Sequence, residues 1–313
     1  MDKLLTVSPS PHIRAPRTTT SIMANVLIAL LPASVMSVVL FGYRALLVLL
    51  VSNLSCGLLE FIWCRLMKKP NTVRDLSCFV TGTLLALTLP ATLGEWQNLW
   101  MVLFGAVVAI IVVKCLFGGI GYNFANPAIT ARIVMFLCFD ATSASVNTNF
   151  ATDATSGATP LADIAAGKTD ALPSVLDMFL GNRGGAIGEV CTVALLLGGI
   201  YLIATKIISW HIPVTYIAVV GLMTLVLGQQ PLYQIMAGGL IIGAFFMATD
   251  YTTSPDTAWG KIIFGLGCGL ITVLIRVYGS YPEGVSFAIL LMNILNPYIV
   301  KLTRKKAFGG AKK

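Results

Sequence analysis

Residues 22–42 read IMANVLIALLPASVMSVVLFG, an apolar run of 21 residues that contains no charged side chain. A helix needs about 20 such residues to cross the hydrocarbon core of a bilayer, so this run predicts a membrane-spanning helix. Similar runs recur along the chain, and we expect ten spans, at residues 22–42, 45–66, 76–92, 97–117, 124–140, 187–207, 212–228, 232–249, 259–278 and 284–302. The sequence therefore predicts an all-α integral membrane protein.

The composition also indicates that lipid surrounds most of the chain. Hydrophobic residues make up 57% of the 313 residues and charged residues 11%, with a mean hydropathy of +0.85. A soluble protein usually carries about 25% charged residues, because its surface must contact water. The net charge of +8 comes from short basic clusters between apolar runs, which argues against nucleic acid as a partner. The seven cysteines are scattered and the two histidines lie far apart, so we expect neither a disulfide nor a metal site.

The positive residues predict the orientation. Cytoplasmic loops are enriched in Lys and Arg, and placing both chain ends inside puts 16 of the 21 basic residues on the cytoplasmic side. We expect a cytoplasmic segment at 1–20, five spans within 21–140, an outer loop at 141–186, five further spans within 187–302 and a cytoplasmic basic tail at 303–313. The long polar loop then faces the outside.

Two short matches suggest an internal repeat. GTLLALT at 82–88 matches GAFFMAT at 243–249 with a shift of 161 residues, and GYNFA at 121–125 matches GVSFA at 284–288 with a shift of 163. Five spans per copy would invert the second copy relative to the first. Inverted repeats commonly build a site near the membrane midplane from interrupted helices. We therefore expect two inverted five-helix repeats.

The outer loop contains the sequence DATSGAT, from Asp153 to Thr159, followed by Pro160. Its side chains are small and polar, and its last residue presents a hydroxyl on an exposed turn. An ordinary flexible loop has the same composition, because Ser, Thr, Gly and Ala are typical loop residues. The residues alone favour the ordinary loop.

This stretch resembles the motif D-x-x-[ST]-G-A-[ST], which a flavin transferase recognises in membrane respiratory proteins. Asp153, Ser156, Gly157, Ala158 and Thr159 fill its fixed positions. In proteins that carry the motif, the transferase joins flavin mononucleotide (FMN) to the last hydroxyl residue through a phosphoester. The resemblance therefore implies a covalent, phosphothreonyl FMN on Thr159.

A wider resemblance covers nearly the whole chain. FGGIGYNFANPA at 117–128, FMATDYTTSP at 246–255 and YPEGVSFAILLMN at 281–293 are similar to sequences of the NqrB/RnfD family of membrane subunits. The resemblance implies a redox-driven ion translocase of the bacterial inner membrane. RnfD serves the Rnf ferredoxin:NAD oxidoreductase, with RnfA, RnfB, RnfC, RnfE and RnfG as partners and Na+ or H+ as the transported ion. NqrB, of the Na+-pumping NADH:quinone reductase, is the alternative. NqrB usually has a longer extension before its first helix, whereas about twenty residues precede the first predicted span here, which favours the RnfD type.

The same resemblance suggests residues around two flavins. Gly181, Arg183 and Glu189 belong to a glycine-rich stretch expected near the FMN. Asn123 and Asn126 are expected to line a site for a second flavin, riboflavin, because each amide offers both donors and an acceptor. The alternative for the two asparagines is helix capping, with Pro127 in the first turn of the helix.

Few charged residues lie at membrane depth, where a functional role is the default expectation. For Glu60 we expect the carboxylate to reach the cytoplasmic interface, and for Asp250 solvation at the end of a helix. Arg132 lies about two turns into its predicted span and has no such explanation. Two other function classes stay open: a solute channel or transporter without redox activity, since inverted repeats also build transporters, and a purely structural anchor of the complex.

Overall fold

The computed structural model describes residues 17–139, 159–166, 172–279 and 283–304, and every element within them is helical. This confirms the all-α class. Two of the long helices begin at a capping threonine: the Thr18 hydroxyl accepts a hydrogen bond from the Ser21 amide, and the Thr257 hydroxyl accepts one from the Gly260 amide. Gly42, with φ of 67°, ends the first helix in a conformation that favours glycine.

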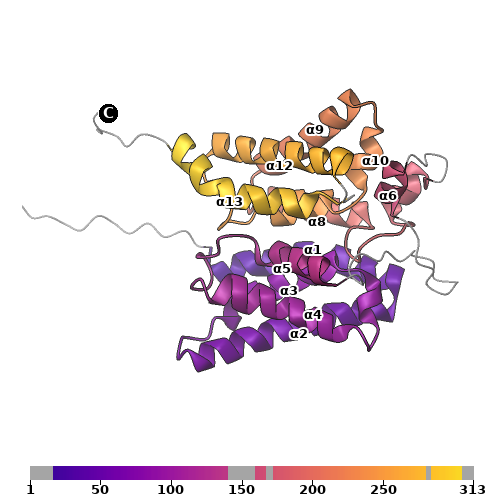
Figure 1. Cartoon of the computed structure of the whole chain (residues 1–313). Coiled ribbons are helices and arrows are strands. Elements are labelled where there is room, and N and C mark those ends of the chain that lie inside the picture. The colour runs from indigo at the N-terminus through magenta and orange to yellow at the C-terminus, as the bar shows by residue number, and fades with distance from the viewer. Residues whose placement is uncertain (1–16, 140–158, 167–171, 280–282, 305–313) are drawn as a thin grey trace, which may run out of the picture.

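The first half of the chain holds α1 to α5, with shorter elements between them (Figure 1). They are α1 (Thr19–Phe41), α2 (Tyr43–Leu66), the 3-10 turn η1 (Val73–Asp75), α3 (Ser77–Thr88), the 3-10 turn η2 (Ala91–Gly94), α4 (Leu99–Val107), its π-helical continuation η3 (Val108–Cys115) and α5 (Pro127–Cys138).

The connecting segment holds α6 (Pro160–Ala165) and α7 (Val175–Leu180), and the second half follows. The second half comprises α8 (Thr192–Ala204), α9 (His211–Val226), α10 (Pro231–Met236), α11 (Leu240–Ile242), the π-helix η5 (Gly243–Met247), α12 (Ala258–Tyr278) and α13 (Val285–Thr303).

Helix lengths differ from the predicted spans. Among the described residues, α1, α2, α12 and α13 are long and apolar enough to cross a membrane, and the remaining apolar helices are shorter. The predicted span 232–249 is divided into α10, α11 and η5, because the chain leaves the helix at Ala237 and turns at Gly238, whose φ is 66°. The predicted span 76–92 stops as a helix at Thr88, just before Pro90. Hydropathy reveals apolar runs but does not reveal where the backbone breaks.

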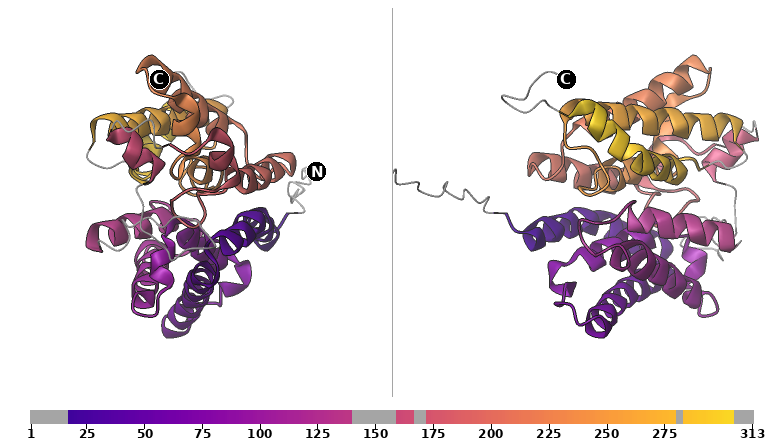
Figure 2. Two further views of the ribbon diagram at one scale, coloured as in Figure 1. Left: turned by 90° about the vertical axis from the view of Figure 1, so that its right-hand side faces the viewer. Right: turned by 60° about the vertical axis from the view of Figure 1, so that its left-hand side comes forward.

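The two halves lie side by side (Figures 1 and 2). Helix α1 packs on α8, and α5 packs on α13, so each half supplies two helices to the boundary. The α1–α8 contact is close, since a side chain at Gly198 would collide with the backbone of Ala29. Small residues allow this approach between membrane helices. Large apolar side chains such as Leu31, Leu54 and Leu58 remain exposed on the outer faces, as expected where lipid is the solvent.

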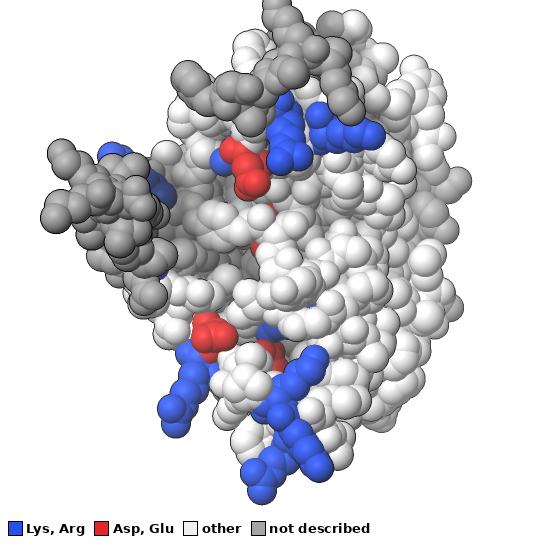
Figure 3. Space-filling view, turned by 90° about the vertical axis from the view of Figure 1, so that its left-hand side faces the viewer, with Lys and Arg blue, Asp and Glu red and all other residues white. Residues whose placement is uncertain are grey.

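The start of α1 and the end of α13 lie at the same end of the fold, on the left of Figure 1, whereas α6 lies at the opposite end. Figure 3 looks onto the end that carries the two termini of the helical body, and Lys and Arg side chains gather there in separate groups. Exposed basic residues lie in the last turns of α2 (Arg65) and α13 (Lys301), in η1 (Arg74), and in the segments between or after helices (Lys68, Lys69, Lys206 and Arg304).

Candidate functional site

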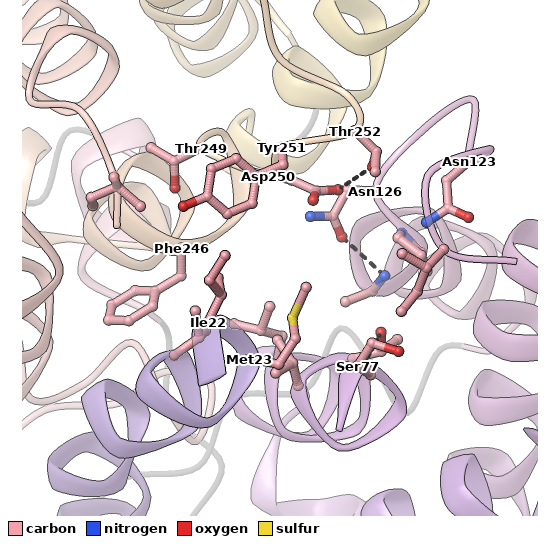
Figure 4. A pocket seen from close by; sticks show the side chains of 18 of the residues that line it. Ile22, Met23, Ser77, Asn123, Asn126, Phe246, Thr249, Asp250, Tyr251 and Thr252 are labelled. Atoms are coloured by element: carbon pink, nitrogen blue, oxygen red, sulfur yellow. Dashed lines mark hydrogen bonds between the residues drawn. The ribbon is translucent and has the colours of Figure 1, made fainter. Parts of the chain in front are cut away.

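A cavity of about 100 Å³ lies at the boundary between the halves. It is near the start of α1, whose Ile22 and Met23 form one wall, and beside Ser77, the first residue of α3. On the other side, Figure 4 shows Asn126, Asp250 and Tyr251. One side of the cavity is therefore formed mainly by apolar side chains of the first half, and the opposite side, called the polar wall below, by polar side chains of both halves.

Asn126 fixes the polar wall. Its Oδ1 accepts hydrogen bonds from the amides of Ala128 (3.0 Å) and Ile129 (3.3 Å), and Pro127 occupies the first turn of α5. This confirms the expected N-cap. Its Nδ2 donates to the carbonyl of Met247 (3.3 Å), at the end of η5 in the other half. One side chain thus caps a helix, lines the cavity and joins the halves.

Asn123 also lines the cavity, and its Oδ1 is buried without a hydrogen-bond partner among the described residues. A buried acceptor without a partner is costly, so it marks a place where a ligand donor fits. Asp250 stands nearby, and its Oδ2 accepts hydrogen bonds from the hydroxyls of Thr252 (3.1 Å) and Thr253 (3.3 Å). Burial raises the pKa of Asp250, while these threonine hydrogen bonds lower it. Helix-end solvation, expected for Asp250 from the sequence, is therefore incomplete.

Both π-helical segments border this cavity. Lys114 of η3 and Phe245 and Phe246 of η5 are among its lining residues. In a π-helix each amide bonds to the carbonyl five residues earlier instead of four, and such segments occur frequently at functional sites. The sequence gives no signal for them, because their composition matches that of any apolar helix.

A buried ion pair borders the cavity on the α3 side. The Lys114 ammonium lies 2.6 Å from Oε2 of Glu60 and also donates to the Ser77 hydroxyl at 2.6 Å. Lys114 is 2% and Glu60 1% exposed, so the expectation that Glu60 reaches the interface is wrong. The carboxylate is instead neutralised by a lysine 54 residues away in the chain, a pairing that sequence spacing does not reveal.

The proposed attachment residue lies at the other end of the fold. Thr159 caps α6, its Oγ1 accepting a hydrogen bond from the Ala162 amide at 3.2 Å. The side chain is half-buried, and Leu161 of the same helix packs against Met236 and Ala237. The other motif residues, Asp153, Ser156, Gly157 and Ala158, lie outside the described residues.

Arg183 and Glu189 are both buried. The Arg183 guanidinium donates to the carbonyls of Glu189 (2.7 Å), Met236 (2.6 Å) and Val190 (3.3 Å). These contacts hold the segment between α7 and α8 in place, so its described contacts are structural. The Glu189 Oε1 accepts from the Ala186 amide at 3.0 Å, while its Oε2 is buried without a partner in the described structure. Gly181 ends α7 with φ of 103°.

Arg132 has a specific partner, which the sequence did not identify. It forms an ion pair with Glu283, just before α13, and so joins the first half to the second. The guanidinium of Arg276, at the end of α12, binds the carbonyls of Gln234 (2.5 Å) and Ala237 (3.1 Å). Charged residues therefore connect segments at this end of the fold as well. The cysteines in the described residues are free, and these residues contain no His, Cys, Asp or Glu group suited to a metal ion.

Comparison with known proteins places this geometry in context. The family described as NQR2, RnfD, RnfE matches the chain over residues 6–309. The chain is 47% identical, over 98% of its length and 96% of the relative, to the D subunit of the Na(+)-translocating ferredoxin:NAD(+) oxidoreductase complex of Acetobacterium woodii. It is 40% identical, over 98% of its length and 96% of the relative, to the D subunit of the proton-translocating ferredoxin:NAD(+) oxidoreductase complex of Clostridium ljungdahlii. The D subunit of an ion-translocating oxidoreductase complex of Stutzerimonas stutzeri is 35% identical over 92% of the chain and 91% of that protein.

Proposed function

The chain belongs to the NQR2, RnfD, RnfE family, and on this premise we propose that it is the D-type membrane subunit of an Rnf ferredoxin:NAD oxidoreductase, an enzyme complex that couples electron transfer to ion transport. The observation that carries the proposal is the similarity over 98% of the chain to relatives named as the D subunits of such complexes. These names favour the Rnf type over the NqrB type and over a channel without redox activity. The two relatives are named for different ions, Na+ and protons, so the transported ion is not assigned.

We propose ten membrane crossings with both ends in the cytoplasm of a bacterial cell, in its inner membrane. Each predicted span overlaps a helix or a broken helix of the structure. The positions of α1 and α13 support an even number of crossings, because the start of one and the end of the other share one end of the fold. The basic side chains at that end support a cytoplasmic location for it. We propose RnfA, RnfB, RnfC, RnfE and RnfG as partner subunits.

The packing supports the inverted repeat. Numbering the spans in chain order, the second span packs on the third and fourth (α2 on α3 and α4), and the seventh packs on the eighth and ninth (α9 on α10 and α12). The fifth span packs on the fourth, as the tenth packs on the ninth. Across the boundary, the first span meets the sixth and the fifth meets the tenth. Related pairs thus form both the halves and the boundary, as a pseudo-two-fold axis requires.

Thr159 would hold a covalent FMN at the outer end. Its Oγ1 accepts a hydrogen bond, and among the described residues its hydroxyl hydrogen is donated to none. Replacing that hydrogen with a phosphoryl group therefore breaks no hydrogen bond that the hydroxyl donates. Half-burial leaves the oxygen accessible to a flavin transferase during maturation. The bound flavin would supply the redox chemistry, while the protein fixes its position.

The cavity between the halves would hold the second flavin, riboflavin. Asn123 offers a buried acceptor without a partner, and Asn126 keeps one amide hydrogen beyond its bond to Met247. The cavity is smaller than the roughly 300–1,000 Å³ of typical ligand sites. A flavin ring would therefore displace the Met23 side chain, whose three rotatable bonds make it adaptable. The two flavins would lie at opposite ends of the subunit, so electrons could cross the membrane between them.

The decisive experiment is a mass spectrum of the peptide spanning residues 150–167, taken from the complex purified from cells that contain the transferase. We expect the mass of this peptide to increase by one FMN phosphoester, and Thr159→Ala to abolish the increase. Ser174→Ala is a matched control, because Ser174 caps the equally short helix α7 by accepting from the Asp177 amide at 3.2 Å. An unmodified peptide from the wild-type complex would refute the covalent flavin. Solute flux through the flavin-free chain in liposomes would favour the channel instead.

A further inference from the structure

Four side chains connect the protein surface to the cavity through continuous hydrogen bonds. The Thr72 hydroxyl donates to Oε1 of Glu60 at 2.5 Å, and Oε2 of Glu60 accepts from the Lys114 ammonium at 2.6 Å. Lys114 also donates to the Ser77 hydroxyl at 2.6 Å. Each of these four groups carries, or can carry, an exchangeable proton.

The ends of this chain lie in different environments. Thr72 is half-buried and directly follows an exposed stretch, residues 65–71. Glu60 and Lys114 are almost fully buried, and both Lys114 and Ser77 line the cavity. The hydrogen-bonded row therefore runs from a water-accessible loop, through the protein, to the wall of the proposed flavin site.

Stability alone does not account for this arrangement. Burying a lysine and a glutamate carries a large desolvation penalty, and replacing such a pair with apolar residues of similar volume is often neutral or stabilising. The surroundings are apolar or weakly polar, including Cys56, Cys78 and Ile110, so a hydrophobic replacement would find suitable neighbours. A function in which protons move explains both the charges and their connected order.

We propose that Thr72, Glu60, Lys114 and Ser77 form a relay that carries protons from the aqueous side to the cavity. The inference rests on the proposed function, because it needs a redox ligand there. For each electron that the ligand receives from the redox partners of the complex, the Ser77 hydroxyl gives one proton to the ligand. Lys114 returns a proton to Ser77, and Thr72 passes one to Oε1 of the Glu60 carboxylate and regains one from water. The Glu60 carboxyl, now protonated, turns and reprotonates Lys114. One electron and one proton enter, and only O–H and N–H bonds break and form.

Glu60 and Lys114 act through Ser77 in this relay, whereas Asp250 on the opposite wall would be a competing proton donor. The test therefore interrupts the row at its surface end. Thr72→Val removes the first hydroxyl and leaves the buried ion pair intact. Thr88→Val is the matched control, because Thr88 is a buried threonine of α3 that does not line the cavity, and its hydroxyl donates to the Leu85 carbonyl at 2.8 Å, outside the relay.

The measurement uses the purified complex. Extraction first determines the non-covalent flavin, and the portion lost in Asn123→Leu is assigned to the cavity. Stopped-flow reduction with a pH-indicator dye, in H2O and in D2O, then gives the rate of proton uptake. We expect Thr72→Val and the charge-free double variant Glu60→Gln/Lys114→Met to slow proton uptake at least tenfold with flavin content retained. Thr88→Val should match the wild type.

Wild-type rates of proton uptake in both interrupted variants, with flavin bound, would overturn the relay alone. Slowing by Asp250→Asn but not by Thr72→Val would also overturn it, and would assign proton delivery to the opposite wall. If Asn123→Leu contains as much non-covalent flavin as the wild type, both the second flavin and the relay are overturned. A merely structural ion pair predicts no effect of Thr72→Val on proton uptake or on its isotope effect.

Discussion

The two halves of the protein place a buried basic residue at related positions, Lys114 and Arg276, which are 162 residues apart. This shift agrees with the 161 and 163 residues that separate the sequence matches. Lys114 lies near the end of η3 and Arg276 near the end of α12, which are the fourth predicted spans of the two halves. Each also holds the start of the third span: Lys114 binds Ser77, and Arg276 binds the Gln234 carbonyl.

The two sites differ in how the positive charge is balanced. Lys114 pairs with the carboxylate of Glu60, whereas Arg276 is held by backbone carbonyls and the Gln234 amide. Carbonyl dipoles are enough to hold a buried cation in place, and they do not exchange protons. Holding Lys114 in place therefore does not by itself require the Glu60 carboxylate. Arg276 only anchors the backbone, whereas the Lys114–Glu60 pair anchors the backbone and can also transfer protons.

The largest loss of stability is expected when the Lys114–Glu60 ion pair is broken. Lys114→Met leaves Glu60 buried and uncompensated, which should destabilise the protein by about 3–5 kcal/mol. Thermal unfolding of the complex in nanodiscs measures the change. The double variant Lys114→Met/Glu60→Gln removes both charges and should recover most of the loss. Equal destabilisation in the single and double variants would show that the charge balance is unimportant.

A smaller loss of stability is expected from Arg276→Lys, at the end of α12. The charge is kept, but a single ammonium cannot reproduce the planar fork that binds the carbonyls of Gln234 and Ala237. One buried carbonyl is left without a donor, at a cost of about 1–3 kcal/mol. The same unfolding assay measures this loss of stability. Removing the charge of a neighbouring acidic residue should not restore the stability. Rescue by a substitution at a nearby acidic residue such as Glu189 would contradict the anchor role.

The smallest effect is expected from an exposed ion pair in the first half. Arg44 and Glu95 lie 3.4 Å apart, with side chains 28% and 47% exposed. Water screens such pairs, so Glu95→Gln should change stability by no more than about 0.5 kcal/mol. A loss as large as that for Lys114→Met would mean that exposure does not decide the contribution of these pairs.

Local sequence predicted local structure well. The Asn126-Pro127 pair predicted the start of α5, and the apolar runs predicted where helices would lie. The resemblance to the NqrB/RnfD family also pointed to Asn123 and Asn126, and both line the cavity. The predictions of the cap and of the helices succeed because the interactions involved join residues a few positions apart or depend only on hydrophobicity.

Long-range pairing could not be predicted. Lys114 falls within the predicted span 97–117 and Glu60 is expected at the interface, yet the two side chains pair in the interior. Arg132 likewise finds Glu283 across the boundary of the halves. These pairings depend on which helices pack together, and a single sequence does not specify this. The π-helices and the break at Gly238 were missed because they are backbone responses to packing.

The cavity wall that Asn126 and Met247 build from both halves has a thermodynamic consequence. A molecule bound there contacts both halves of the protein, so its binding free energy adds to the free energy that keeps them together. At a free concentration of 100 times its dissociation constant, it would contribute about 2.7 kcal/mol to resistance against unfolding. Assembly of the protein and loading of the cavity are then a single coupled equilibrium, and cofactor supply would limit how much of the protein survives in the membrane.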